Sequence, residues 1–385
     1  MSVKIPYDRI NPYNQLPLLP PLEEKIMDIE IMTKLANARG ALGKLDGIVR
    51  TLPNPEMLVN TITLREAKDS SEIESIFTSH DELYQAMAVE TTEMSANARE
   101  VLRYREALEI GFKTLKSTNK IEMSTILAIY HKIENTTQGI RPPTLSTVIK
   151  KGGSSMTSGQ IIYTPPRGKG IIEDLLNNWL DYCNDNLTYK YDALIKMAIT
   201  HYQFEAIHPF SDGNGRTGRI LNLLILSQKG LLTYPVLYLS GYIIRNKNEY
   251  YAALGAVTER FSWKNWILFI LEGVEQTSYY TINLIEKINE LFDNTKNYIL
   301  NENPKFNQEI IKLLFFQPYI RAVNIVNTQS CKITSRQTAD KKLMELVELN
   351  MLSKKYVGRE TVYINHQLIS LISEKTDTTI YTTKS

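Results

Sequence analysis

The most informative part of the chain is residues 208–219, which read His208-Pro209-Phe210-Ser211-Asp212-Gly213-Asn214-Gly215-Arg216-Thr217-Gly218-Arg219. Its proline disfavours the α conformation at the preceding residue, and its three glycines permit backbone conformations in which N–H groups turn toward a ligand. Residues 220–226, which follow, are apolar except for one asparagine and contain no glycine or proline. The pattern predicts a loop that runs into a buried helix, with the first turn of the helix inside the motif.

The side chains of this motif suit phosphate chemistry. A helix start offers free backbone N–H groups and a positive dipole end to a phosphate. Arg216 and Arg219 are three residues apart and share a helix face, and guanidinium groups suit bidentate phosphate contacts. Asp212 suits Mg²⁺, which usually binds through one or two carboxylates plus nucleotide phosphates, and His208 has the pKa range of a general base. Each feature alone is ordinary turn or core chemistry, but the order and spacing together indicate a metal–nucleotide site beside a base.

The motif resembles the signature of the Fic (filamentation-induced-by-cAMP) family, HPFx[D/E]GNGRxxR, and every fixed position matches. The resemblance implies a mainly helical fold and transfer of AMP from ATP to a hydroxyl group of a protein target, with Mg²⁺ as the metal. It implies that His208 is the base, that Asp212 holds Mg²⁺, and that Arg219 binds the γ-phosphate. It further implies an anion nest for the α- and β-phosphates at Gly213, Asn214 and Gly215, and a phosphate clamp at Arg216. We expect Phe210 to anchor the loop in the core.

A second segment, residues 70–76, reads Ser-Ser-Glu-Ile-Glu-Ser-Ile. It lies in a helical pattern whose apolar face we expect to comprise Ile73, Ile76, Phe77 and Leu83. By itself it is an exposed helix with a glutamate. Compared with Fic proteins, the segment resembles their inhibitory helix, whose motif is [S/T]xxxE[G/N]. Ser70 and Glu74 stand at the fixed positions, and Ser75 stands where the family has Gly or Asn. If Glu74 reaches Arg219, it occupies the donor for the γ-phosphate, and the enzyme is nearly silent at rest.

Two more segments fit the same interpretation. Lysines and glycines at 150–153 precede a short β-propensive run at Gln160, Ile161, Ile162 and Tyr163, which predicts a surface hairpin. It resembles the family's flap, which lays the target beside the active site by strand addition. Residues 246–254 resemble the segment whose tyrosines line the adenine. Because Tyr250 and Tyr251 are adjacent on a helix, we expect only one of them to touch the base, with core packing as the alternative.

The composition is that of a folded protein with two or three domains. The chain has 385 residues, 43% of them hydrophobic and 22% charged, and a net charge of +2, which excludes a disordered chain or a membrane protein. No apolar run approaches the thickness of a bilayer and the first residues lack a signal-peptide core, so we expect a cytoplasmic protein without membrane contact. Cys183 and Cys331 have no CxxC spacing and are expected to be buried, without disulfide or zinc.

Three regions are expected in a mainly α fold. Residues 1–100 form an N-terminal region that carries the inhibitory helix; its first 23 residues are proline-rich, and Leu52-Pro53-Asn54-Pro55 resembles a phrase of bacterial Fic proteins. Residues 101–300 form the catalytic core with its hairpin. Residues 301–385 are predicted to contain helices at 308–316, at 322–326 and from an N-cap at Ser335, then two short strands within 352–364. Helices followed by a hairpin indicate a winged helix.

Winged helices often bind DNA, so a nucleic-acid partner is a second hypothesis. The candidate phosphate contacts are Arg336, Lys341, Lys342, Lys354, Lys355 and Arg359. Asp340, Glu345, Glu348 and Glu360 offset them, and a protein-docking role fits at least as well.

Two classes of function therefore remain. One is an adenylyltransferase restrained by Glu74, with ATP and a Ser, Thr or Tyr hydroxyl of a protein as partners. The other is a DNA-binding regulator or toxin–antitoxin-like adaptor. Within the enzyme class, the site could also remove AMP or transfer another phosphate-linked group. The resemblance also implies a possible homodimer.

Overall fold

The computed structural model describes residues 7–26, 28–52, 55–89, 94–151, 159–185, 188 and 191–374. The predicted mainly α fold is confirmed, since the strands in this part of the chain form only two small antiparallel sheets. The N-terminal region contains η1 (Glu23–Lys25), α1 (Ile29–Thr51), α2 (Pro55–Ile73) and α3 (His80–Ala88). The central region contains α4 (Ala96–Thr118), α5 (Met123–Glu134), β1 (Ile149–Lys151), β2 (Gln160–Tyr163), α6 (Ile171–Asn184), α7 (Ala193–Ile207), α8 (Asn214–Gln228), α9 (Leu239–Arg245), α10 (Lys247–Arg260) and α11 (Trp263–Glu302).

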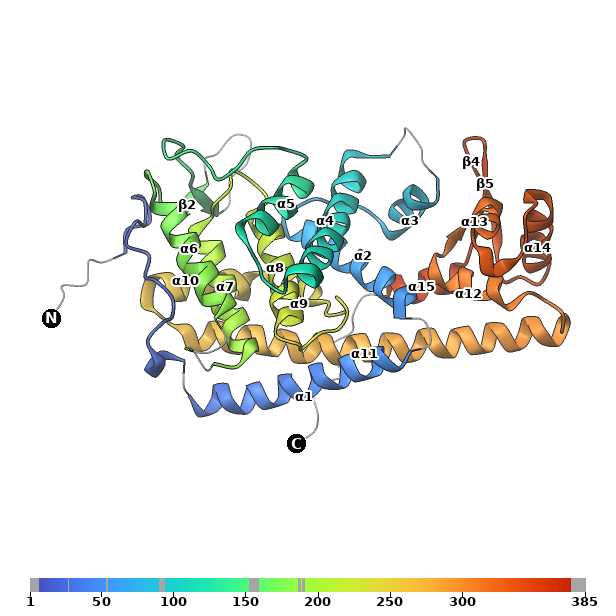
Figure 1. Cartoon of the computed structure of the whole chain (residues 1–385), viewed down its shortest axis with the longest axis horizontal. Helices are drawn as coiled ribbons and strands as arrows, with labels where there is room; N and C mark the ends of the chain where they lie inside the picture. The colour runs from blue at the N-terminus through green and yellow to red at the C-terminus, as the bar shows by residue number, and fades with distance from the viewer. Residues whose placement is uncertain are drawn as a thin grey trace.

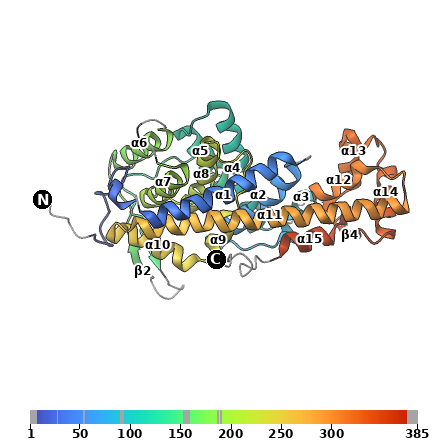
Figure 2. The same ribbon diagram turned by 90° about the horizontal axis from the view of Figure 1, so that it is seen from below.

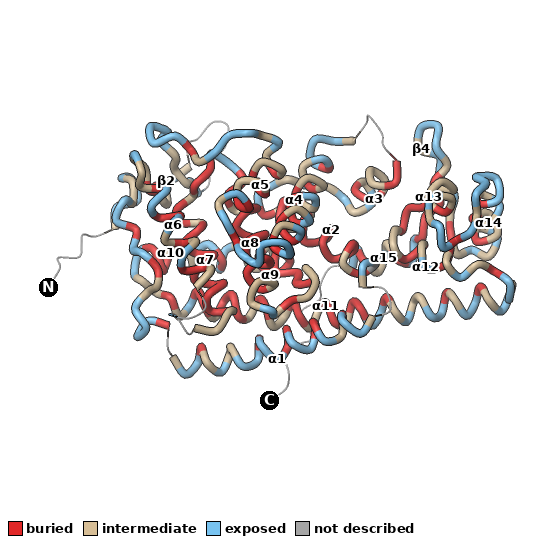
Figure 3. Tube along the Cα trace, viewed as in Figure 1, coloured by how far each residue is buried: buried red, intermediate tan, exposed pale blue. Residues whose placement is uncertain are grey.

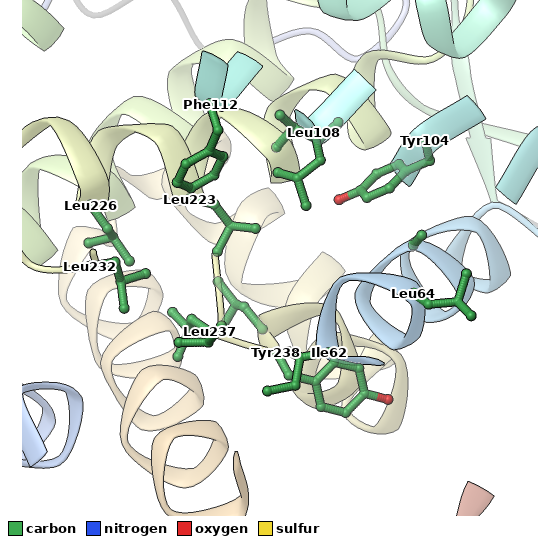
Figure 4. Close-up of a cluster of buried hydrophobic side chains, with 14 of the residues drawn as sticks. Ile62, Leu64, Tyr104, Leu108, Phe112, Leu223, Leu226, Leu232, Leu237 and Tyr238 are labelled. Carbon is green, nitrogen blue, oxygen red and sulfur yellow. The ribbon is translucent and has the colours of Figure 1, made fainter. Parts of the chain in front are cut away.

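The core surrounds α7 and α8, which are buried over most of their length (Figure 3). A helix that is apolar on every side must be enclosed by others, and these two are. In the view of Figure 4, Leu223 of α8 lies next to Phe112 of α4, Leu226 lies next to Leu232, and Ile62 of α2 lies next to Tyr238, all within one buried cluster. The long helix α11 runs beneath this assembly with α1 beside it, as two perpendicular views show (Figures 1 and 2). None of the helices in the described residues is long and apolar enough to cross a membrane.

The C-terminal region has the predicted winged-helix arrangement. It contains α12 (Gln308–Phe316), β3 (Tyr319–Ile320), α13 (Ala322–Asn327), η2 (Gln329–Cys331), α14 (Arg336–Glu348), β4 (Ser353–Val357), β5 (Glu360–Ile364) and α15 (His366–Ser373). The three strands pair in the order β3-β5-β4, and β3 and α15 are absent from the sequence prediction. Ser335 is the N-cap of α14, although its side chain makes no capping hydrogen bond. Cys183 and Cys331 are free and buried, as predicted.

The predicted continuous helix through residues 70–77 is wrong, because α2 ends at Ile73. Ser75 has a left-handed φ of 67°, and its N–H donates to the Glu72 carbonyl at 2.9 Å, while the Ile76 N–H donates to the Ser71 carbonyl at 3.1 Å. This pair of bonds is a Schellman motif, which stops a helix. Phe77 is consequently 61% exposed, and Leu83 lies on the separate helix α3.

Candidate active site

The loop between α7 and α8 is fixed by two side chains of the motif. Phe210 is fully buried and stacks on Tyr130, with ring centroids 3.9 Å apart and planes at 2°. The Asn214 amide closes the loop, since its Oδ1 accepts from the Phe210 N–H at 2.8 Å and its Nδ2 donates to the Phe210 carbonyl at 2.9 Å. The predicted loop anchor is thus present, and it places His208 next to the N-terminus of α8.

Arg141 also holds this loop, although no sequence pattern indicates such a role for it. Its Nε donates to the His208 carbonyl at 2.7 Å, and its backbone N–H donates to the Pro209 carbonyl at 2.9 Å. Its Nη2 donates to the carbonyl of Pro166, just after β2. One guanidinium therefore ties the loop to the end of the hairpin segment.

His208 is the C-cap of α7, with φ 50° and ψ 60°. Burial and the positive charge of Arg141 lower its pKa to about 4, although Glu74 acts in the opposite direction. The imidazole is therefore neutral at pH 7 and able to accept a proton. Its Nδ1 is buried and has no hydrogen-bond partner in the described part of the chain.

Arg219 meets the end of α2, as inhibition by Glu74 would require. Its side chain is 2% exposed. Its Nε donates to Ser70 Oγ at 2.8 Å, and its Nη2 donates to the Ser70 carbonyl and to Glu74 Oε1, both at 2.9 Å. A Cβ at Gly215 would overlap the Glu74 carboxylate, so the glycine lets that carboxylate lie against the N-terminal turn of α8.

Glu74 carries its negative charge in this position. Burial acts to raise its pKa, but Arg219 outweighs burial, so the pKa lies below its usual value. The side chain is still 35% exposed, which leaves the pair partly open to solvent screening. Lys247, at the start of α10, donates from Nζ to the Ile73 carbonyl at 2.5 Å and so holds the last residue of α2.

Arg216 faces different partners from Arg219, despite their spacing. It is 3% exposed, and its Nη1 pairs with Glu100 of α4 while its Nη2 pairs with Glu134 of α5 at 2.8 Å. The structure therefore places this guanidinium among carboxylates rather than beside Glu74. Its predicted contact with phosphate stays a prediction.

Asp212 is 80% exposed at the side chain, and its Oδ1 accepts from the Gly213 N–H at 2.7 Å. Within the described residues, no group of three or more His, Cys, Asp or Glu side chains could hold a metal ion by itself. A single accessible carboxylate does fit Mg²⁺ that arrives with nucleotide phosphates, because this ion needs few protein ligands.

The two tyrosines of α10 have different surroundings. Tyr250 is 2% exposed, and its hydroxyl lies 2.9 Å from Nε2 of His201, whose ring stacks on Trp266. Tyr251 is 41% exposed. Tyr250 is therefore a core residue, and Tyr251 is the tyrosine with a face available to a nucleotide base.

Three family models match consecutive parts of the chain. Residues 32–113 match the Fic/DOC family N-terminal model, residues 120–226 match the Fic/DOC family model, and residues 291–368 match the C-terminal domain of SoFic-like protein adenylyltransferases. The chain belongs to the Fic/DOC family.

Curated relatives of this Fic protein are named as adenylyltransferases. A segment of 92 residues, 24% of this chain, is 37% identical to protein adenylyltransferase fic-1 of Caenorhabditis elegans and covers 17% of that protein. A segment of 211 residues, 53% of this chain, is 30% identical to a probable protein adenylyltransferase of Aquifex aeolicus (strain VF5) and covers 58% of it. The chain thus spans less than two thirds of the length of these relatives.

Solved structures share the fold. A Fic family protein from Desulfovibrio desulfuricans G20 superimposes with a TM-score of 0.56 and 15% identity, over 90% of this chain and 98% of that one. Fic-1 from Caenorhabditis elegans superimposes with a TM-score of 0.51 and 20% identity, over 67% and 74% of the two chains. At these identities the likeness concerns the fold alone.

In this Fic protein the predicted hairpin pairs β1 with β2 in antiparallel register, Lys151 opposite Gln160. Gly152 and Gly153, which precede its second strand, and Pro53 and Asn54 of the N-terminal phrase lie outside the described residues. The Tyr163 hydroxyl donates to the Ala206 carbonyl at 2.7 Å. The hairpin is therefore attached to α7 close to His208.

The C-terminal cations that favoured a DNA partner are partly used within the Fic chain. Lys342 pairs with Glu345 at 2.7 Å, and Lys355 donates to Gln85 at 3.1 Å. DNA binding stays a hypothesis.

Proposed function

We propose that the chain is a nucleotidyltransferase that transfers AMP from ATP to a hydroxyl group of a protein target and that Glu74 restrains it. One observation carries the proposal: a carboxylate of the chain itself occupies Arg219 and the N-terminal turn of α8, beside a neutral histidine. Helix N-termini and guanidinium groups recognise phosphate through the donors that hold this carboxylate. The names of the curated relatives support ATP as the donor.

In the proposed reaction, the phosphates lie along the first turn of α8, at Gly213, Asn214 and Gly215, with Arg216 and Arg219 as the cations. His208 accepts the proton of the target hydroxyl, whose oxygen forms a bond to the α-phosphorus. The bond from that phosphorus to the diphosphate group breaks, and diphosphate leaves. Mg²⁺, held by Asp212 together with the phosphates, would supply positive charge that offsets theirs.

The restraint is a competition for one guanidinium. Arg219 cannot bind the γ-phosphate through Nη2 while Glu74 accepts from that nitrogen. ATP would then bind without the alignment that an in-line displacement needs. For the target, we propose that Gln160, Ile161, Ile162 and Tyr163 align a strand of the partner protein beside His208, and that Tyr251 contacts the adenine.

Two parts of the proposal, the transfer of AMP and the restraint by Glu74, can be tested in one assay. The assay measures how much label the purified full chain incorporates from ATP labelled at the α-phosphate. We expect strong incorporation by Glu74→Gly, and none when His208→Ala is added to it. Glu72→Ala is the control, because Glu72 lies on the same turn but pairs with Lys68 at 2.8 Å, and alanine does not weaken the helix as glycine would. It should behave like the wild type.

Equal incorporation by the wild type and Glu74→Gly would contradict the restraint. Incorporation that survives His208→Ala would contradict the role of the base. If no variant transfers label, even with added lysate proteins as targets, the proposed transferase activity is wrong.

A further inference from the structure

Glu205 is a carboxylic acid of the site that the proposed reaction leaves without a role. It lies on α7, one turn before His208, and its Oε1 is buried without a hydrogen-bond partner among the described residues. A Cβ at Gly218 would lie 2.5 Å from this oxygen. The close approach of α7 and α8 at this glycine thus leaves an unpaired carboxyl group against the turn that carries Arg219.

The three hydrogen bonds that Arg219 donates within the described part of the chain go to the end of α2, to the side chain and carbonyl of Ser70 and the carboxylate of Glu74. If this end withdraws, the guanidinium loses these acceptors together, and if Glu74 alone is removed it loses the only anion among them. A buried cation without acceptors is unstable, so another group must replace them. Glu205 interacts electrostatically with Arg219, and it belongs to the catalytic core, which stays when α2 moves.

We propose that Glu205 is a further residue of the nucleotide site, whose carboxylate receives Arg219 when Glu74 withdraws and releases it, with uptake of one proton, when a phosphate binds. This inference rests on the proposed nucleotide binding. The proton comes from solvent and forms an O–H bond on Glu205, and no other bond forms or breaks. Arg219 stays charged throughout and exchanges one anion for another.

The charges around Glu205 support the exchange. Burial raises its pKa to about 7, with Arg219 lowering it and Glu74 raising it. Removal of Glu74 takes away an anion that favours the protonated acid, so the pKa falls and Glu205 ionises. A phosphate on Arg219 restores the negative charge, the pKa rises again, and the acid recovers its proton. Nucleotide binding should therefore weaken as the pH rises through this window.

Among the described residues around Arg219 and Glu205, the histidines and tyrosines, including Tyr104 of α4, stay in one protonation state near pH 7, and one carboxylic acid is an exception. On α7, burial lowers the pKa of His201 to about 3 and that of His208 to about 4, so both rings are neutral. On α10, burial raises the pKa of Tyr250 and Tyr251, which keep their protons. The exception is Glu66 of α2, whose pKa burial also raises to about 7.

Glu66 provides the matched control for this reason. Its Oε2 accepts from the Ser240 N–H at 3.0 Å, and its Oε1 accepts from the Ser240 hydroxyl. It already has hydrogen-bond partners on α9, so we expect no exchange of Arg219 with Glu66. The pKa of Glu66 is nevertheless close to that of Glu205, about 7 in both cases. Replacement of Glu66 therefore shows whether loss of any buried acid with such a pKa changes proton uptake.

The experiment is isothermal titration of a non-hydrolysable ATP analogue with Mg²⁺ into the full chain carrying Glu74→Gly. Measurement at one pH in buffers of different ionisation enthalpy gives the number of protons taken up, and a series from pH 6 to 8.5 gives the affinity. We expect uptake approaching one proton near neutral pH, and an affinity that falls by up to about tenfold per pH unit above the pKa of the free protein.

Adding Glu205→Gln should remove most of this uptake and strengthen binding at pH 8, whereas adding Glu66→Gln should preserve both. Glu205→Asp keeps a titratable acid and should retain the uptake, which separates the charge from a packing role. Unchanged uptake in Glu205→Gln overturns the inference and leaves the proposed function intact. Absence of analogue binding in every folded variant overturns the proposed function itself.

Discussion

We expect the turn at Ser75 to determine how stable the contact of Glu74 with Arg219 is, because its left-handed conformation ends α2 just where Glu74 leaves the helix. A side chain at φ 67° costs roughly 1–2 kcal/mol that glycine avoids. Ser75→Gly should therefore stabilise the Schellman turn by about 1 kcal/mol, which lowers the fraction of protein with Glu74 withdrawn about fivefold. Ser75→Val should act in the opposite direction, because a branched side chain tolerates this conformation poorly.

The assay is basal incorporation of label from ATP at a fixed protein concentration, with the melting temperature measured in parallel. We expect about fivefold less incorporation for Ser75→Gly and an increase of similar size for Ser75→Val, where the added strain is again about 1 kcal/mol. Lys332→Gly is the control, since Lys332 has φ 52° in the winged helix, far along the chain. It should change the melting temperature without changing incorporation.

The reasoning is refuted if Ser75→Gly raises basal incorporation, or if the glycine and valine variants change it in the same direction. A change that Lys332→Gly reproduces would show that global stability, rather than the turn, sets the activity. The Glu74→Gly background gives a second check. In that background Ser75→Gly should hardly change incorporation, because residue 74 no longer has a carboxylate that could contact Arg219.

Two further predictions concern the same contact and the base. Lys247→Met should raise basal incorporation roughly tenfold, because the loss of a charged hydrogen bond of about 1.5 kcal/mol frees the Ile73 carbonyl; Lys305→Met, at an exposed position, should leave it unchanged. Turnover of Glu74→Gly at saturating ATP should not fall until the pH approaches 4, because the lowered pKa of His208 keeps the base neutral above that value. An acid limb at pH 6–7, with the protein folded by circular dichroism, would contradict this role of His208.

The helical core and the loop with its two arginines could be predicted because their signals are local. Residues 208–219 contain the loop, the helix start and both arginines, and the apolar run after them specifies a buried helix. The possible contact of Glu74 with Arg219 also came from the sequence, but only through resemblance to a family motif. No spacing within the chain relates two residues that are 145 positions apart.

The parts that the sequence did not reveal depend on distant or unusual partners. Arg141 holds the loop through backbone carbonyls, which leave no trace in the side-chain pattern. Glu205 looks like an ordinary helix residue until α8 packs against it at Gly218. The sequence predicted that the helix continues past Ile73, where α2 ends. The residue with the left-handed conformation is a serine, whereas glycine is the usual sequence signal for the end of a helix. β3 has only two residues, too few for a recognisable alternation.

The contact at Arg219 also depends on packing well away from the site, because α2 is held along its length. Arg65, two turns before Ile73, donates to the Ile372 carbonyl at 2.5 Å and to the Glu374 carbonyl at 3.2 Å, at the end of α15. Asn60 donates to the Phe316 carbonyl at 3.0 Å, at the end of α12. A rigid helix transmits a displacement at one end to the other. The winged helix therefore helps to position the Glu74 carboxylate against Arg219, and the stability of this contact includes the docking of the C-terminal region as well as the ion pair itself.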